Sequence, residues 1–291
     1  MNALIIGVGN IGIRHLQGIS KTTAKKKNIY LFDISKKYKT KYKPELLILK
    51  KKINIFFVKK LYEINKIKFD IIIISTTAEN RTKILISILD NIKSKYIVIE
   101  KPICNSIKDL KNLKKISSNK IFVNFPHRYC LWNEKINNKI QKYFSSTKLD
   151  VLVTGSNLNI ASNVAHYVDL LNMWTKSFPK KIDTSGLGNW KKSKRKGFYE
   201  LSGSIKIFFK NGHFLKIHNN EKYSNQLIYI RNREKKKLCI INYLEGYAKF
   251  VKYGSVLGKM KFQSDSTNIL YKILNSSKIK KLSNLKLSVK C

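Results

Sequence analysis

The chain opens with an apolar run that breaks into glycines, and this feature constrains its fold most. Residues 3–6 are apolar, and Gly7-x-Gly9-x-x-Gly12 follows before a helix-like pattern begins. Gly7 allows a tight turn, Gly9 lets the backbone approach a pyrophosphate, and Gly12 lets the helix pack onto the strand. The N–H groups at the start of that helix would then face the anion.

A second apolar run, residues 29–32, ends in Asp33. Asp33 follows Gly12 by about 20 residues, where a dinucleotide site places the carboxylate that binds a ribose diol. Such a carboxylate repels a 2′-phosphate, so NAD is the expected cofactor, and Lys36 and Lys37 leave NADP possible. The alternative to a dinucleotide site is a glycine-rich structural turn.

Composition limits the class of protein. A chain of 291 residues with 43% hydrophobic content is long and apolar enough for two packed domains. It has no run that matches a membrane span, and its amino terminus does not resemble a signal peptide. The four cysteines are scattered without metal-binding spacing. We therefore expect a cytoplasmic protein without a metal site or a membrane partner.

The formal net charge of +42 would attract any polyanion. The basic residues are nearly all lysines, however, and they are spread along the whole chain. A nucleic-acid module would more often concentrate arginines and exposed aromatic side chains in one segment. We expect no specific nucleic-acid partner, only weak, salt-sensitive association and attraction of phosphorylated substrates.

Up to residue 123 the chain alternates strand-like and helix-like stretches, which predicts a Rossmann-type doubly wound parallel sheet in domain 1–123. Residues 124–291 change character. Helical patterns at 132–144 and 164–174, short strands and an Asn211-Gly212 turn predict an α+β domain with an open, mostly antiparallel sheet. The expected strands are 3–6, 29–32, 53–58, 69–75, 96–100, 121–123, 150–154, 203–209, 213–218, 226–230, 237–243 and 247–253, with further helices at 84–89, 106–116 and 266–274.

Three motifs lie far apart in the chain. They are Gly7-x-Gly9-x-x-Gly12-x-Arg14-His15, Glu100-Lys101-Pro102 and Ala165-His166-Tyr-Val-Asp169-Leu-Leu. With these motifs, in this order and spacing, the sequence resembles the glucose-fructose oxidoreductase / inositol dehydrogenase / MocA-like family. The resemblance spans nearly the whole chain, except residues 35–65 and the carboxyl-terminal tail.

The resemblance implies that Lys101 lies between nicotinamide and substrate, where an ammonium would hold the reacting hydroxyl and help to move its proton. Glu100 could orient Lys101, and Pro102 permits the cis peptide common in the family. The alternative is a surface lysine in a turn. The position of Lys101 directly after an apolar strand favours function, because ligands bind at the carboxyl ends of such strands.

The same resemblance places His166 against the substrate as a proton acceptor or donor. Asp169, three residues later on the helix, could fix the imidazole. The alternatives are a histidine that only packs against the sheet and an aspartate that stabilises its helix. Many active family members carry an aspartate four residues before this histidine, where this chain has Ser162 beside Asn163. A serine cannot act as a carboxylate base.

One further stretch differs from the family pattern, and another resembles it. The strand-end loop reads Thr76-Thr77, with Arg81 where the family has a histidine; Arg81 would suit a phosphate or carboxylate. Asn124 and Arg128 resemble the family's Asn-x-x-x-Arg stretch. They could bind ribose or substrate hydroxyls and an anionic group, or form a polar loop between domains.

These inferences define the expected site. Lys101 and His166 are the candidate catalytic residues, and no metal ligands are expected. The cofactor-binding candidates are Gly7, Gly9, Asn10, Ile11, Gly12, Asp33, Ser75, Thr76, Glu100 and Lys101. The substrate-binding candidates are Asn124, Arg128, Ser162, Asn163, His166 and Asp169.

The resemblance implies an NAD(P)-dependent oxidoreductase that acts on a secondary alcohol or ketone of a sugar, cyclitol or nucleotide-sugar, for example in surface-polysaccharide synthesis. It also implies a homodimer or homotetramer that associates through the open sheet. Because the aspartate is missing, a non-catalytic regulator that binds NAD and a sugar is the alternative.

Overall fold

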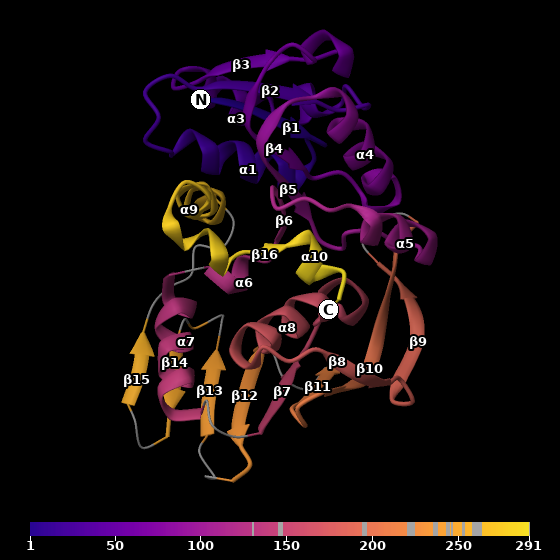
Figure 1. Cartoon of the computed structure of the whole chain (residues 1–291), viewed down its shortest axis with the longest axis vertical. Helices are drawn as coiled ribbons and strands as arrows, with labels where there is room; N and C mark the ends of the chain where they lie inside the picture. The colour runs from indigo at the N-terminus through magenta and orange to yellow at the C-terminus, as the bar shows by residue number, and fades with distance from the viewer. Residues whose placement is uncertain are drawn as a thin grey trace. The chain divides into compact units, whose positions relative to one another are not determined.

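The computed structural model describes most of the chain and divides it into two compact units (Figure 1). One unit contains Met1–Tyr129 and the described residues from Ser264 onward, and the other spans the chain between them. The described residues are 1–129, 131–144, 148–193, 197–219, 225–234, 238–242, 245, 247–251, 254–257 and 264–290.

The first unit is built on a seven-stranded sheet with the order β16-β6-β5-β4-β1-β2-β3. Strands β1 to β6 pair in parallel, and β16 joins the edge antiparallel to β6. The order 3-2-1-4-5-6 is that of the doubly wound dinucleotide-binding fold. The strands are β1 (Asn2–Ile6), β2 (Asn28–Phe32), β3 (Asn54–Phe57), β4 (Phe69–Ile74), β5 (Ser94–Glu100), β6 (Ile121–Asn124) and β16 (Ser283–Asn284).

The strands of this sheet form because their apolar runs are continuous. Residues 71–74 of β4 are wholly buried, as expected for a parallel strand covered on both faces. In α1, Ile13, Leu16 and Ile19 are buried at helical spacing. The helices of the unit are α1 (Asn10–Ser20), α2 (Tyr38–Lys41), α3 (Lys43–Lys50), α4 (Arg81–Asn91), α5 (Ile107–Lys115), α6 (Pro126–Tyr129), α9 (Ser264–Leu274) and α10 (Leu285–Ser288), with 3₁₀ helices η1 (Leu61–Ile64), η2 (Ala78–Asn80) and η3 (Ser277–Lys281).

The carboxyl-terminal segment returns to the first unit, which differs from the expected division at residues 123 and 124. Helix α9 packs against α1, and β16 extends the sheet beyond β6 (Figure 1). The physical reason is apolar burial, since Leu270, Leu274 and Leu282 belong to the hydrophobic core that surrounds β1.

The second unit contains a nine-stranded sheet with the order β15-β14-β13-β12-β7-β11-β10-β8, and β9 pairs with β10 alone. The β7–β11 pair is parallel and the other pairs are antiparallel. The strands are β7 (Leu149–Gly155), β8 (Pro179–Asp183), β9 (Leu187–Lys192), β10 (Tyr199–Phe209), β11 (Phe214–Asn219), β12 (Leu227–Asn232), β13 (Leu238–Asn242), β14 (Tyr247–Phe250) and β15 (Gly254–Leu257).

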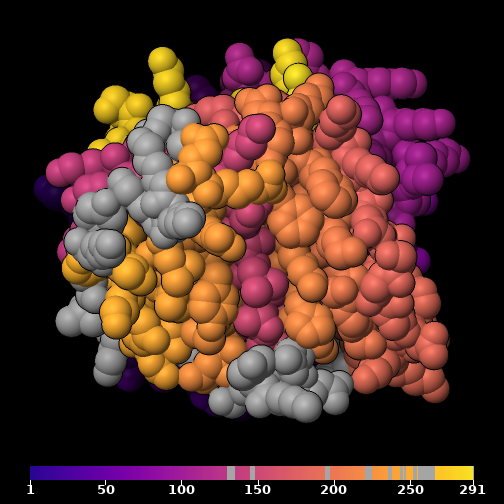
Figure 2. Space-filling model, turned by 90° about the horizontal axis from the view of Figure 1, so that it is seen from below, coloured from indigo at the N-terminus to yellow at the C-terminus, as the bar shows by residue number. Residues whose placement is uncertain are grey.

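Helices α7 (Leu131–Phe144) and α8 (Ile160–Thr175) belong to this unit. Alternation along the strands separates two faces: Ile205, Ile207 and Phe209 are buried, whereas Phe208 is 40% exposed. Helix α8 packs on β10 and β11. Figure 2 shows a broad surface of strand side chains, with β7 as a pink stripe between the orange strands β12 and β11.

The expected fold class is confirmed. A parallel Rossmann sheet is followed by a mostly antiparallel one, and Asn211-Gly212 connects β10 to β11 with a φ of 79° at Gly212. Sequence patterns did not indicate α3, β8 or β9. The expected strands 237–243 and 247–253 have ends outside the described residues, and β13 and β14 occupy the rest.

Candidate functional site

The glycine-rich turn between β1 and α1 is closely packed on two sides. Gly7 has a φ of 88°, and a Cβ there would lie 2.6 Å from the backbone nitrogen of Thr76. A Cβ on Gly12 would lie 2.1 Å from the carbonyl oxygen of Gly7. Both positions therefore require glycine so that the turn can approach the end of β4 and the helix can pack on the turn.

Gly9 is different, because a Cβ there would meet no described atom within 4 Å. The N–H of Ile13 donates to the carbonyl of Gly9. The N–H groups of Asn10, Ile11 and Gly12 come before this bond, at the end of the helix where N–H groups have no carbonyl acceptor within the helix. Open space next to helix N–H groups fits the pyrophosphate of a dinucleotide. The turn therefore has the room and the donors that this cofactor needs.

Asp33 follows β2 and lies beside the same turn. Its carboxylate accepts hydrogen bonds from the N–H groups of Val8 at 2.6 Å and Ser35 at 2.8 Å. Each oxygen keeps a further lone pair for a ribose hydroxyl. Burial, together with the charge of Asp33, raises the pKa of Tyr38 to about 12.

The side chain of Asn10, at the start of α1, is held from the α2–α3 segment. Its carbonyl oxygen accepts hydrogen bonds from the hydroxyl of Tyr42 and from the ammonium of Lys41, the latter at 3.4 Å. This segment belongs to residues 35–65, which have no recognisable counterpart in the family that the chain resembles. Its contact with Asn10 places it beside the start of α1, next to the glycine-rich turn.

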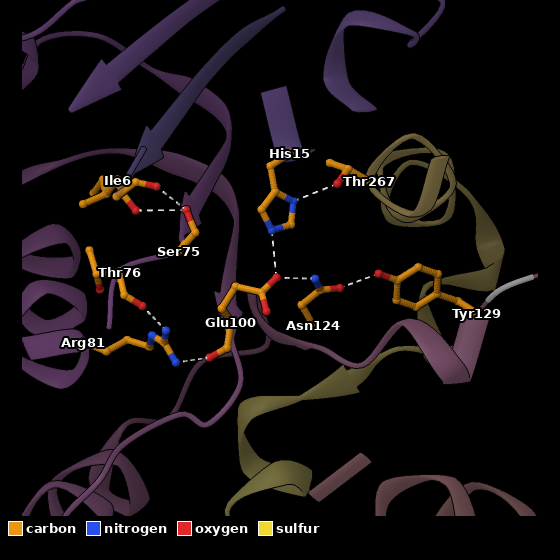
Figure 3. Close-up of polar contacts among 10 residues, drawn as sticks. Ile6, His15, Ser75, Thr76, Arg81, Glu100, Asn124, Tyr129 and Thr267 are labelled. Carbon is orange, nitrogen blue, oxygen red and sulfur yellow. Dashed lines mark hydrogen bonds and ion pairs between the residues drawn. The ribbon is translucent and has the colours of Figure 1, made fainter. Parts of the chain in front are cut away.

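Ser75 and Thr76 follow strand β4 directly (Figure 3). The hydroxyl of Ser75 donates to the carbonyl of Gly7 at 2.7 Å, with the carbonyl of Ile6 at 3.2 Å. Ser75 therefore ties β4 to the glycine-rich turn. The Oγ1 atom of Thr76 is buried without a hydrogen-bond partner among the described residues.

Arg81 does not have the position expected for an anion-binding residue. It is 4% exposed, and its guanidinium donates to backbone carbonyls, including that of Glu100 at 2.6 Å (Figure 3). The carbonyls of Thr76 and Pro102 also accept hydrogen bonds from it. Arg81 thus joins the loops after β4 and β5, because carbonyl groups from two strand ends converge on it.

Glu100 ends β5 and is the centre of a buried polar network (Figure 3). Its carboxylate accepts hydrogen bonds from Nε2 of His15, at 2.8 Å, and from the amide of Asn124. Nδ1 of His15 lies 2.7 Å from the hydroxyl of Thr267 on α9. The network therefore connects α1, β5, β6 and α9 within the first unit.

Electrostatics stabilise the charged form of Glu100. Burial acts to raise the pKa of its carboxyl, but the hydrogen bond and charge of His15 oppose this effect. The hydrogen bond from Asn124 and the charge of Arg81 act in the same direction as His15, so the pKa of Glu100 lies below its ordinary value.

Asn124 and Arg128 are both buried, at the end of β6 and in the short helix that follows it. Asn124 is 4% exposed; its amide group donates to the carboxylate of Glu100, and its carbonyl oxygen accepts from the hydroxyl of Tyr129, so it completes the buried network. Arg128 lies in α6 and is 7% exposed. Their contacts with a ribose or a substrate stay predictions.

Lys101 follows β5 directly, is half-buried, and forms a cis peptide with Pro102. Its neighbour His127 was missed by sequence reasoning. Burial first, and then the charge of Lys101, lower the pKa of His127 to about 4. A histidine three residues after a strand of the parallel sheet was the signal that could have indicated it, since ligands bind at such strand ends.

The remaining candidates lie on α8 in the second unit. His166 is half-buried, whereas Asp169 is 1% exposed, so the two side chains have different environments. The amide of Asn163 donates to the carbonyl of Leu158 at 2.9 Å and thereby closes the turn before the helix. The hydroxyl of Ser162 donates to a carboxylate oxygen of Glu200, a contact that sequence reasoning missed.

The described ranges of the chain contain neither a cluster of metal-binding side chains nor a membrane-spanning helix. No three His, Cys, Asp or Glu side chains in these ranges gather as ligands for a metal ion. Within the same ranges, none of the helices has the length and apolar character needed to cross a membrane.

Comparisons with solved structures support the fold. A UDP-N-acetylglucosamine 3-dehydrogenase from Acidithiobacillus ferrooxidans superposes with a TM-score of 0.70, at 12% identity, over 100% of this chain and 93% of that one. A biliverdin reductase from Synechocystis, solved with biliverdin and NADP⁺, gives 0.70 at 10% identity over 99% and 95%. A myo-inositol dehydrogenase from Lactobacillus casei, solved with NAD(H) and myo-inositol, gives 0.61 at 14% over 80% and 71%.

No curated protein sequence matches the chain. Residues 1–124 match the model of an oxidoreductase family described by its NAD-binding Rossmann fold. This match covers the glycine-rich turn, Asp33, the loop that Arg81 holds, and the Glu100–Lys101 strand end. This NAD-binding part of the chain is therefore similar to the oxidoreductase family GFO_IDH_MocA.

Proposed function

We propose that this oxidoreductase transfers hydride between a nicotinamide cofactor and a secondary alcohol or ketone of a sugar, cyclitol or nucleotide-sugar. The observation that carries the proposal is the position of Lys101. It follows β5 at the carboxyl edge of the parallel sheet, in the same unit as the open turn at Gly9 and the carboxylate of Asp33. Substrates bind at this edge in such folds.

Different residues of the first unit would bind different parts of the cofactor. The turn at Gly9 and the N–H groups that follow it would hold the pyrophosphate, and Asp33 would hold the adenosine ribose. When bound, the nicotinamide ring supplies the acceptor or donor of hydride. The negative carboxylate of Asp33 would repel the 2′-phosphate of NADP, so NAD would be the preferred cofactor.

Lys101 would hold the reacting hydroxyl and stabilise the alkoxide that develops as its proton leaves. The backbone on both sides of Lys101 is fixed, because Arg81 donates to the carbonyls of Glu100 and Pro102. The carboxylate of Glu100 is anchored in turn by His15. This clamp would hold Lys101 in one position during turnover.

His166 on α8 would accept the substrate proton during oxidation and return it during reduction. Histidine is the side chain whose charge changes between pH 5 and 8, which suits proton transfer near neutral pH. The sugar-like substrate class is supported by two proteins of similar fold, a UDP-N-acetylglucosamine 3-dehydrogenase and a myo-inositol dehydrogenase. The formal charge of +42 favours substrates that carry phosphate or carboxylate.

The test follows NADH absorbance with a panel of sugars, cyclitols and nucleotide-sugars. Lys101→Met should lower kcat/KM by about 100-fold or more, the usual contribution of a positioned acid–base group. Lys95→Met is the matched control, because Lys95 is an exposed lysine on the same strand that lies over the ring of Tyr96. It should leave turnover unchanged.

Two outcomes would contradict the proposal. Turnover by Lys101→Met at the wild-type rate would remove Lys101 from the chemistry. Binding of both NAD and a sugar without any turnover would instead favour the non-catalytic regulator, which the serine at position 162 already makes the second candidate.

We also propose that the chain forms a homodimer or homotetramer through the open face of its second sheet. Phe208 and Phe214 lie on neighbouring strands of that sheet with their ring centroids 5.2 Å apart, and Phe208 is 40% exposed. Light scattering of the wild type and of Phe208→Glu measures the assembly. A wild-type monomer would contradict this part of the proposal.

A further inference from the structure

Helix α8 receives a negative charge at its amino-terminal end from a different element. Its first turn contains no acidic residue. Glu200 on β10 accepts a hydrogen bond from the hydroxyl of Ser162, and its second oxygen lies 3.3 Å from the backbone nitrogen of Ser162. A carboxylate is stabilised by the free N–H groups and dipole at such an end. Glu200 is therefore built into the start of α8.

The helix face that begins at this carboxylate carries His166. Ser162 and His166 are four residues apart, so their side chains lie on the same face of α8, one turn from each other. Residues 161–166 are half-buried, whereas 167–174 are buried. The carboxylate of Glu200 and the imidazole of His166 thus belong to the accessible end of the helix.

Glu200 reaches α8 because strand β10 changes course. Tyr199–Leu201 pairs with β9, whereas Lys206–Phe209 pairs with β8. Strict alternation would place Glu200 on the face of Lys206 and Phe208, opposite the buried face on which α8 packs. Instead its carboxylate meets α8, so the alternation is broken between the two halves of the strand.

The break lies at Gly203. This residue has a φ of 82°, and the pairing register shifts between Leu201 and Gly203. A Cβ on Gly203 would lie 2.3 Å from the carbonyl oxygen of Gly186, so no other residue fits without movement. Irregularities of this kind often re-aim a side chain next to an active site. Here the re-aimed side chain is Glu200.

We propose that Glu200 is the positioning carboxylate of the substrate site and acts through His166 in place of an acidic residue at position 162. The inference rests on the proposed function. In the oxidation direction, the C–H electron pair leaves the substrate carbon as hydride to the nicotinamide, and the hydroxyl proton passes to His166 as the C=O bond forms. The carbon is oxidised, NAD⁺ is reduced, and the imidazolium that results is stabilised by the carboxylate of Glu200.

The first test is Glu200→Gln, assayed on the substrate that the absorbance screen identifies. The carbonyl oxygen of glutamine can still accept the hydrogen bond from the hydroxyl of Ser162, although its NH2 group cannot accept the longer one from the backbone N–H. The variant thus removes the charge and keeps the shape. We expect kcat to fall by at least about tenfold, as for loss of a group that assists proton transfer. The KM for NAD should stay at the wild-type value, and the thermal unfolding midpoint should fall by no more than a few degrees, the usual effect of losing a charge at a helix end.

The second test moves the carboxylate from the strand to the helix. Ser162→Asp in the Glu200→Gln background should recover most of the lost kcat, a rescue that a purely structural role would not produce. The matched control is Asp183→Asn. Asp183 also accepts from a serine hydroxyl and its N–H, those of Ser185 at 2.6 and 3.0 Å, but it lies at the end of β8. It should have wild-type turnover.

The outcomes separate this inference from the proposed function. Wild-type protein that binds NAD but turns over no substrate refutes the proposed function, and the role of Glu200 falls with it. Active wild-type protein with an equally active Glu200→Gln variant refutes the role of Glu200 alone. A loss in Glu200→Gln that the added Ser162→Asp does not rescue also refutes it, because the charge would then not be the cause.

Discussion

Replacing Arg81 with methionine would remove a guanidinium that joins two loops at the carboxyl edge of the first sheet. Arg81 is buried and donates to the carbonyl oxygens of Thr76, Glu100 and Pro102. Methionine keeps much of the apolar packing and removes every donor. A buried acceptor that loses its donor costs about 1–3 kcal/mol of stability.

Three carbonyls lose their donor in this variant. Loop movement and entering water would satisfy part of the loss, so we expect Arg81→Met to lower the free energy of unfolding by about 3–5 kcal/mol. Natural domains have only about 5–15 kcal/mol in total. The variant should therefore unfold at a clearly lower urea concentration than the wild type.

Urea unfolding followed by circular dichroism measures this difference. Arg14→Met is the control, because Arg14 is exposed on α1 and bonds the side chain of Gln17 at 3.0 Å. Such a surface substitution should change stability by less than about 0.5 kcal/mol. An Arg81→Met variant with the wild-type midpoint would show that the guanidinium does not hold the two loops together.

Three other predictions concern the cofactor and pH. Gly9→Val would place a side chain in the open space of the turn. Calorimetry should show that the Kd for NAD rises by at least about tenfold, or about 1.4 kcal/mol. An unchanged Kd would show that the pyrophosphate does not lie against Gly9. Asp33→Asn should shift the ratio of the NADP and NAD dissociation constants toward NADP by about tenfold, and an unchanged ratio would exclude Asp33 from ribose recognition. His127, whose pKa falls from 6.5 to about 4 on folding, binds its proton more readily in the unfolded chain. The stability that the neutral, buried His127 contributes is therefore fully present above about pH 6.5. As pH falls toward about 4, the free energy of unfolding should decrease by up to about 3 kcal/mol. Urea midpoints of His127→Gln should fall less between pH 7 and 4 than those of the wild type, and parallel curves would contradict this.

Local patterns predicted the first sheet and its turn well, because the physical causes are local. A continuous apolar run becomes a covered parallel strand, as residues 71–74 do in β4. Gly7 and Gly12 are required by contacts with backbone that lies nearby once the turn forms. The position of Asp33 after its strand follows from the same short unit.

The roles of Arg81, Asn124 and Glu200 could not be predicted in this way, because their partners come from distant segments. Arg81 meets carbonyls at the ends of two different strands, and Asn124 meets Glu100 on the neighbouring strand. Glu200 reaches Ser162 only because β10 is irregular at Gly203. A resemblance assigns roles by position in the chain, and so it could not indicate the contact of Glu200 with Ser162.

The return of the carboxyl-terminal segment has a consequence for how the chain is made. His15 and Thr267 are 252 positions apart, yet they share one buried hydrogen bond. During synthesis, the ribosome delivers the whole second unit before the piece that completes the first. Until then the β6 edge lacks its antiparallel neighbour and the surface beneath α9 stays uncovered, which exposes a nascent chain to aggregation. The first unit can therefore reach its final packing only after residues 264–290 have left the ribosome.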